Sequence, residues 1–386
     1  IAGTAGAVNV NPDGLGQVGL FPYYTVQNGN STLIYITNTT SNGKVVKVRF
    51  LEGKNSREVL DFNLYLSKND IWTGAIVADG TTGAKIITAD KTCTVPAISS
   101  AGVAFRNFLY SGSSADGEDT SLARTREGHL EIIEMGTMNA DESGTASATS
   151  RSPFRPNDWA THSSGVPFSC TNLVNSWGAG AEWTTLPTRA LTVNSGGLYA
   201  GAFIINGAAG TGNQYNATML DSFNTVSVLH SAPGDTAPSL TQANPPTSIV
   251  FNNGVVVSSN WAGTTPSAGL NAVTATIMHS NVMNEYSVET GLAAQTDWVI
   301  THPTKALYVA HPGGTGTVGN ALVVRPPFTT NFGAGGSRPG TNNPVTYPPT
   351  TGGACELVSL SLWDREERTP SASVDFSPQP PGGTNS

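Results

Sequence analysis

Short apolar stretches with alternating polar residues run through most of this chain, and their period of two is typical of β-strands. Four early segments are rich in β-branched and aromatic residues, and Asn28-Gly29 and Asn42-Gly43 supply turns between three of them. These segments are 18–26, 31–37, 44–52 and 57–66. We predict that they form an antiparallel meander.

The third of these segments shows the alternation clearly. Val46, Val48 and Phe50 point to one side, and the intervening Lys47 and Arg49 point to the other. A strand with this pattern has one face on a core and one face in water. We therefore expect Lys47 and Arg49 to be solvated.

Further strand signals continue to the end of the chain. They cover 71–77, 84–88, 102–110, 129–134, 191–193, 198–205, 247–256, 297–301, 306–310, 321–324 and 356–363, and Trp72, Trp298 and Trp363 within them are expected in the core. Loops are expected at 137–168, 206–216, 231–246 and 311–350, where Gly, Pro, Ser and Thr are frequent. Helices are predicted only at 169–177, with Ser169 as the cap, and at 272–283.

Many short strands and few helices predict an all-β fold, an antiparallel β-sandwich or jelly-roll-like domain with extended terminal segments. The expected organisation is an N-terminal extension over 1–16, a β-sandwich body over 17–363 and an extended tail over 364–386. A break near 137–168 would allow two smaller sandwiches.

Composition narrows the class of protein. Only 12% of the 386 residues are charged, well below the roughly 25% of ordinary globular domains, and the net charge is −8. A chain poor in Lys and Arg is a weak partner for nucleic acid or an anionic membrane, and no apolar run is long enough for a membrane span. The chain begins at Ile1 in a run of small residues, which favours removal of an upstream secretion signal.

Three cysteines allow one disulfide and leave one thiol. The possible pairs are Cys93 with Cys170, Cys93 with Cys355, and Cys170 with Cys355. We favour Cys93 with Cys170, because both lie at turn-like positions, whereas Cys355 opens an apolar strand where a free thiol packs as a small hydrophobe.

The search for catalytic signatures favours a protein that is not an enzyme. The sequence lacks Gly-x-Ser-x-Gly, His-Glu-x-x-His, Cys-x-x-Cys-His and a Walker phosphate loop, and its six histidines are scattered. Glu131 and Glu134 share a predicted strand, but an offset of three places them on opposite faces. Glu131 with a distant acid such as Asp61 is the remaining arrangement for glycoside hydrolysis, and solvated strand charges are the simpler interpretation.

One acidic loop offers oxygen ligands. Asp116, Glu118 and Asp119 lie close together, and carboxylates are the ligands that Ca²⁺ prefers. The loop lacks the spacing of an EF-hand, so a hydrated turn is the alternative to a calcium site. No other cofactor is indicated.

Four segments resemble a family of uncharacterised secreted surface proteins of Gram-negative bacteria. They are 50–64 (FLEGKNSREVLDFNL), 119–128 (DTSLARTREG), 297–305 (DWVITHPTK) and 363–367 (WDREE). The resemblance implies a secreted protein, extracellular or at the cell surface, that takes part in surface association. The family has no assigned activity, so the resemblance transfers no functional residue.

The tail suggests how the protein associates. In its Pro- and Gly-rich sequence, Ala372, Val374 and Phe376 alternate with polar residues, the pattern of a strand with one buried face. Such a segment is suited to strand addition to a neighbouring sheet. Val8 and Val10 near the other terminus form a second candidate donor.

The leading hypothesis is a structural subunit of an extracellular filament or surface layer, a homo-oligomer that polymerises with copies of itself by strand exchange. Two alternatives to polymerisation stay open. The first is a monomeric protein, such as an adhesin, in which both tails fold back on their own subunit. A β-sandwich of this kind also suits a carbohydrate-binding module or a glycan-acting hydrolase, with glycans as partners.

Overall fold

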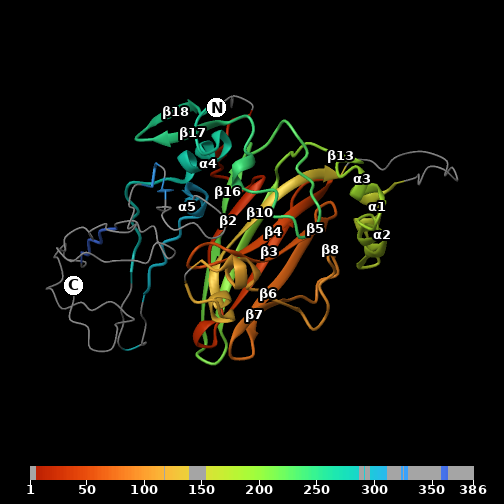
Figure 1. Ribbon diagram of the computed structural model, residues 1–386, viewed down its shortest axis with the longest axis horizontal. Helices are drawn as coiled ribbons and strands as arrows, with labels where there is room; N and C mark the ends of the chain where they lie inside the picture. Colours follow the sequence, from red (N-terminus) through yellow and green to blue (C-terminus); the bar gives the residue numbers. More distant parts are fainter. Residues whose placement is uncertain are drawn as a thin grey trace.

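Two antiparallel sheets pack face to face in the computed structural model, which describes residues 6–116, 118–138, 154–286, 291, 296–310, 323–324, 326–328 and 358–363 (Figure 1). The prediction of an all-β sandwich is confirmed. Its extended tail at 364–386 lies outside the described residues.

The first sheet has the strand order β1-β16-β2-β10-β4-β5-β8, with β13 paired to β10. Its strands are β1 (Asn9–Val10), β2 (Val18–Thr25), β4 (Gly43–Glu52), β5 (Glu58–Leu66), β8 (Cys93–Val95), β10 (Glu127–Met138), β13 (Leu191–Thr192) and β16 (Thr218–Asp221). The second sheet has the order β15-β14-β3-β6-β7-β9. Its strands are β3 (Ser31–Asn38), β6 (Ile71–Asp79), β7 (Gly83–Ile87), β9 (Val103–Ala104), β14 (Leu198–Asn206) and β15 (Thr211–Asn216).

The expected meander is wrong at its second strand, which lies in the other sheet, although β4 and β5 pair as antiparallel neighbours as expected. β2 and β4 belong to the first sheet, whereas β3 between them belongs to the second and pairs with β6 and β14. Asn28, with φ of 53°, and Gly29, with φ of 81°, turn the chain as expected, but they carry it across the sandwich. A half-buried strand buries its apolar face equally well from either sheet, so alternation alone does not decide its partner.

Strands from before and after 139–153 share both sheets, so the described strands build one sandwich. β10 pairs with β13, and β3 pairs with β14. The main core lies between the sheets, where Val48 and Ile132 from the first sheet join Ile36 and Trp72 from the second.

The outer face of the first sheet is covered, which contradicts the expectation that Lys47 and Arg49 are solvated. Lys47 is 0% exposed and Arg49 is 8% exposed. Residues 231–234 run across this face: the Lys47 ammonium donates to the carbonyl of Ala232 at 3.3 Å, and the Asn63 amide donates to Ser231 at 2.9 Å. The polar row therefore faces a loop instead of solvent, and it satisfies that loop's main-chain carbonyls.

Short helices lie at two ends of the sandwich (Figure 1). One group comprises α1 (Pro156–Ala160), α2 (Cys170–Asn175) and α3 (Glu182–Thr185), beside the small ribbon of β11 (His162–Ser163) and β12 (Val166–Pro167). The other comprises α4 (Ala268–Ile277), α5 (Lys305–Tyr308), the hairpin of β17 (Thr247–Asn252) and β18 (Val255–Asn260), and the pair β19 (Val309–Ala310) and β20 (Val323–Val324). Single 3-10 turns occur at Gln27–Gly29, Phe108–Tyr110, Gly112–Ser114, Leu122–Arg126 and Leu240–Gln242.

The two predicted helices exist with changed limits. Ser169 caps α2 by accepting from the Asn172 amide, as expected. The helix predicted at 272–283 begins earlier, because Ser267 caps it, and it ends at Ile277, leaving Met283 94% exposed. Among the described residues, no helix is both long and apolar enough to cross a membrane.

Several local predictions fail. Segments 297–301 and 358–363 form no strand, and Trp298 and Trp363 are exposed, although Trp72 is fully buried. The predicted loop 206–216 contains strand β15, which the sequence does not predict because its residues are mostly polar. The predicted strand 247–256 is a hairpin.

Candidate functional site

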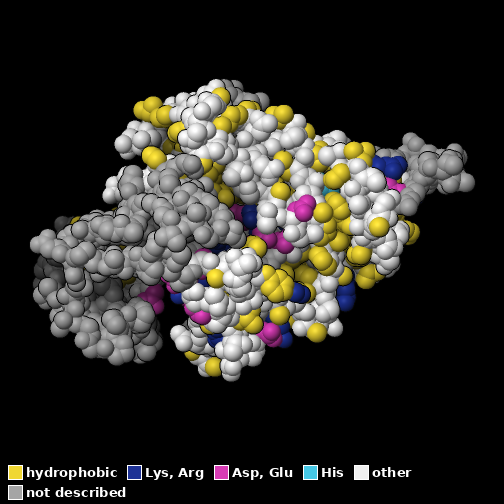
Figure 2. All heavy atoms as spheres, viewed as in Figure 1, with side chains coloured by type: hydrophobic (Ala, Val, Ile, Leu, Met, Phe, Trp, Pro, Cys, Tyr) yellow, Lys and Arg dark blue, Asp and Glu magenta, His cyan; other side chains and the backbone are white. Residues whose placement is uncertain are grey.

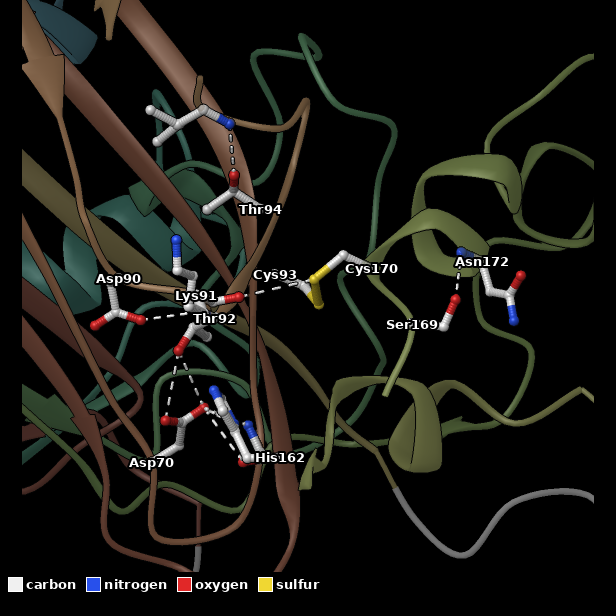
Figure 3. Close-up of a disulfide and its surroundings, with 12 residues drawn as sticks. Asp70, Asp90, Lys91, Thr92, Cys93, Thr94, His162, Ser169, Cys170 and Asn172 are labelled. Carbon is white, nitrogen blue, oxygen red and sulfur yellow. Dashed lines mark hydrogen bonds and ion pairs between the residues drawn. A yellow bond between two sulfur atoms is a disulfide. The ribbon is translucent and has the colours of Figure 1, made fainter. Parts of the chain in front are cut away.

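The predicted disulfide is confirmed. Cys93 at the start of β8 is joined to Cys170 at the start of α2 with a Cα–Cα separation of 5.2 Å (Figure 3). The bond closes a sequence separation of 77 residues and attaches the helices α1–α3 to the edge strand of the first sheet. Asp70 lies beside the loop before Cys93, within 3.5 Å of the Thr92 hydroxyl and 3.7 Å of His162. The disulfide therefore joins these short helices covalently to the sheet, in addition to the apolar contacts that Leu173 and Trp183 make in a core shared with it.

The acidic side chains of the predicted calcium site contact basic and hydroxyl side chains. Both carboxylate oxygens of Asp116 accept from the Arg124 guanidinium, at 2.8 and 2.9 Å. Glu118 pairs at 3.1 Å with Lys54, and Asp119 accepts from the Ser121 hydroxyl. In the part of the chain that the structure describes, no group of acidic, His and Cys residues is arranged to hold a metal ion. The calcium site stays an untested prediction.

Segments 50–64 and 119–128, which are far apart in the chain, meet at Arg124. This residue lies between Glu52, at 3.0 Å, and Asp116, and its guanidinium lies 4.1 Å from the centre of the Tyr110 ring. Burial would raise the pKa of Asp116, but hydrogen bonds from Arg124 and Asn55 outweigh it and hold that pKa well below its usual range. The ion pairs of Arg124 with Glu52 and Asp116 therefore attach the loop before β10 to the end of β4.

A second charged row lies on the outer face of the first sheet. Glu131, Arg49 and Asp61 are direct cross-strand neighbours on β10, β4 and β5. Arg49 pairs with Glu131 and also with Glu58 at 2.6 Å, and Lys47 pairs with Asp61 at 2.8 Å.

These acids are poor hydrolytic groups. Burial raises the pKa of Glu131 despite the Arg49 charge beside it, and Glu131 is 3% exposed. Glu134 lies on the opposite face, as expected, where it pairs with buried Lys44 at 2.7 Å and accepts from two main-chain amides. Asp61 joins Glu131 in one row, but Arg49 fills the space between them. The arrangement suits structural ion pairs, not a carboxylate pair across a cleft.

The predicted donor segments have different outcomes. Ala372, Val374 and Phe376 lie outside the described residues. Val8 is fully buried in its own subunit and forms a parallel bridge with Ser248, and β1, which contains Val10, pairs with β16. The N-terminal segment thus completes its own fold, and donation by it would require these contacts to be exchanged.

The hairpin β17–β18 is the feature that the sequence interpretation missed. It projects from the sandwich beside α4, and hydrophobic side chains are visible on it (Figures 1 and 2). Phe251 is 74% exposed and Val255, Val256 and Val257 are at least 43% exposed. Its base is held by the bridge to Val8 and by α4, which packs against β17.

The outer edge of β18 is open. Among the described residues β18 pairs only with β17, and the six residues of β18 form a longer and more apolar edge than the two- or three-residue edge strands β1, β8 and β9. β15 is an equally long edge strand, but its sequence is polar. Natural edge strands are protected by shortness, charge or proline, and β18 has none of these.

Two sequence signals mark this hairpin. Asn253-Gly254 lies between the paired residues Asn252 and Val255, and both turn residues adopt positive φ, 49° and 82°, as a two-residue hairpin turn requires. In addition, no Asp, Glu, Lys or Arg occurs between Asp235 and Glu285. The exposed apolar hairpin therefore lies in a span that contains no acidic or basic side chain of these types.

Comparison of the chain with models of known protein families, with curated proteins and with solved structures finds no match.

Proposed function

We propose that this protein is a structural subunit that assembles with copies of itself through strand addition to the open edge of β18, forming an extracellular filament or surface layer. The observation that carries this proposal is the exposed, uncharged Val-Val-Val edge of a hairpin whose other strand, β17, is bridged by Val8 only at its base. An added strand satisfies main-chain donors and acceptors along such an edge and covers its apolar side chains.

The donor in this proposal is the segment 371–377 of a neighbouring copy. Its alternating Ala372, Val374 and Phe376 would supply an apolar face to match the valines of β18. Donor and acceptor are different parts of the chain, so each contact leaves one free donor and one free acceptor. A head-to-tail contact that does not close produces a fibre.

Two further observations support a secreted structural role. The Cys93–Cys170 disulfide is typical of oxidising compartments outside the cytosol. The acids on the outer face of the first sheet form ion pairs: Glu58 and Glu131 with Arg49, and Asp61 with Lys47. This use of the acids favours a scaffold over a catalyst.

The test is the mass distribution of the intact secreted protein, measured by size-exclusion chromatography with light scattering. We expect large assemblies in the parent chain and a 40 kDa monomer after deletion of 369–386 or after the substitution Val256→Lys. Val256 is 51% exposed, so a lysine at this position introduces an edge charge without disturbing a core.

Gln214→Lys, on the polar edge strand β15, is the matched control and should leave assembly unchanged. A parent chain that is monomeric at all concentrations would refute the proposal. Assembly that survives both Val256→Lys and the tail deletion would refute the mechanism. A discrete dimer lost in Val256→Lys but not after tail deletion would instead indicate that β18 pairs with β18 of a second copy, and would also overturn the donor assignment.

A further inference from the structure

A pocket of about 680 Å³ opens at the end of the sandwich opposite the hairpin β17–β18. It lies between α2, α3, the end of β8 and the loop that follows β16. The residues that line it include Trp177, Trp183, Pro187, His230, Ser231 and Asp235. Hydrophobic side chains gather between the sheet and these helices (Figure 2). The volume is within the roughly 300–1,000 Å³ range of small-molecule sites, and none of the proposed assembly contacts involves it.

A chain of hydrogen bonds fixes one wall of this pocket. The Trp177 indole N–H donates to the Tyr65 hydroxyl at 2.9 Å, and that hydroxyl lies 3.0 Å from Nε2 of His230. Nδ1 of His230 lies 2.7 Å from the carbonyl of Pro187, which only accepts. Nδ1 therefore carries the proton, Nε2 accepts from Tyr65, and the wall uses its polar atoms internally.

The aromatic rings behind this wall are closely packed. The Trp183 ring stacks on Tyr65 with centroids 5.3 Å apart, and it is fully buried. Trp177 lies 5.7 Å from Trp183 and 4.9 Å from His230, and it is only partly buried. Trp177 is thus a rigid, partly open aromatic platform that is held in place before any ligand arrives.

A single charged group accompanies this platform. Asp235 is exposed, and its carboxylate makes no hydrogen bond to any residue that the structure describes. A carboxylate accepts hydrogen bonds from two neighbouring hydroxyl groups, while an aromatic face contacts the C–H face of a sugar ring. The platform and the acceptor line the same pocket.

From this juxtaposition we infer that the pocket binds one hexopyranose unit of a glycan, with the sugar ring against Trp177 and its hydroxyls on Asp235. An organic cation is the competing ligand, because it also suits an aromatic residue and a carboxylate. An aromatic cage for a cation needs several open ring faces, however, and Trp183 and His230 are buried. One open ring and one hydroxyl acceptor fit a neutral sugar better. This inference does not depend on the assembly proposal.

The test is a titration of the full chain with four sugars: methyl glucoside, methyl galactoside, methyl mannoside and N-acetylglucosamine. Binding is detected by tryptophan fluorescence and by saturation-transfer NMR. We expect saturable binding of at least one sugar in the millimolar range, as is reasonable for one shallow subsite. Trp177→Ala and Asp235→Asn should each weaken it about tenfold or more, and Trp177→Phe, which keeps a ring, should weaken it less.

Trp363→Ala is the matched control, since Trp363 is 59% exposed and does not line the pocket. Near-ultraviolet circular dichroism checks that each variant keeps its packing. Absence of saturable binding by all four sugars, or equal binding by the parent and a folded Trp177→Ala variant, would overturn the inference. Choline binding that Trp177→Ala abolishes, without sugar binding, would identify a cation site instead. Light scattering on the same samples reports assembly separately.

Discussion

Two regions of this molecule treat charge in opposite ways. Strands β4, β5 and β10 bury Lys44, Lys47, Arg49, Glu131 and Glu134 in ion pairs on both faces of the first sheet. The span from 236 to 284, which includes the hairpin, has no charged side chain of these types, and it exposes valine and phenylalanine. A chain with only 12% charged residues has therefore buried some of its few charges inside the fold. Its open edge is left without the charges that normally prevent strand pairing.

The largest expected effect comes from breaking a buried pair. Arg124→Met leaves Glu52 buried without its cation and leaves Asp116 with only Arg57, at 3.7 Å, and we expect a loss of about 3–5 kcal/mol in the free energy of unfolding. Lys54→Met removes an ion pair with Glu118 that is about half exposed and should cost at most about 1 kcal/mol. Urea unfolding of both variants checks this difference. Equal losses would mean that burial of the charges does not distinguish the two pairs.

Acid should weaken the charge-rich region next. Burial lowers the pKa of His129 to about 4 and that of His230 to about 3, against about 6.5 in an unfolded chain. The unfolded chain then binds more protons between these values, so stability should fall as the pH drops from about 6.5 to 4, by an amount on the order of a few kcal/mol.

Two acids oppose this loss. Burial raises the pKa values of Glu58 and Glu131 despite the Arg49 charge beside them, so protonating these residues in the native state favours folding as the pH falls. Unfolding measured across this pH range should still show a net loss. His129→Leu should flatten the slope, because the Nε2 atom of His129 is buried without a hydrogen-bond partner. An unchanged slope would exclude His129 as a source of the acid sensitivity.

A smaller effect is expected at the hairpin turn. Gly254 has φ of 82°, so Gly254→Ala should lower the free energy of unfolding by about 1 kcal/mol through backbone strain. A Cβ at this position would meet no other atom within 4 Å, so no steric clash adds to this loss. Hydrogen exchange should report faster opening of β17 and β18 and an unchanged sandwich core. Asn253→Gly, at a residue that also has positive φ, is the control and should keep the turn. Faster exchange in β4 and β10 as well would show that the hairpin and sandwich open together.

The smallest effect on stability is expected for Val256→Lys, which places charge where the chain has none. Because Val256 is exposed, the free energy of unfolding should change by less than about 0.5 kcal/mol. Self-association should nevertheless be lost if β18 is the acceptor edge. Thermal unfolding beside light scattering separates these two results, and a large fall in stability would mean that Val256 is part of the fold.

Much of the fold was predictable from local patterns. The alternation in 44–52 and 198–205 predicted strands within a residue or two, and the cap at Ser169 predicted α2. Cys93 and Cys170 were chosen from their turn-like surroundings, and they are joined. These features depend on a few neighbouring residues, so sequence reports them directly.

The candidate sites were less predictable. The hairpin was interpreted as one strand, because its apolar residues outweighed Asn253-Gly254. The pocket was not anticipated, because Tyr65, Trp177 and His230 are separated by up to 165 residues before the fold joins them. No local spacing indicates such a meeting.

The sequence by itself determined that this chain forms strands, that it contains few charged residues, and that one disulfide is available. Only the tertiary structure decided which sheet each strand joins, that Lys47 and Arg49 lie under a loop, and that β18 keeps an open edge. The physical reason is that a strand's alternation specifies which residues need burial but not which neighbour provides it. That choice depends on contacts between segments distant in the chain, such as Val8 with Ser248 and Asn63 with Ser231.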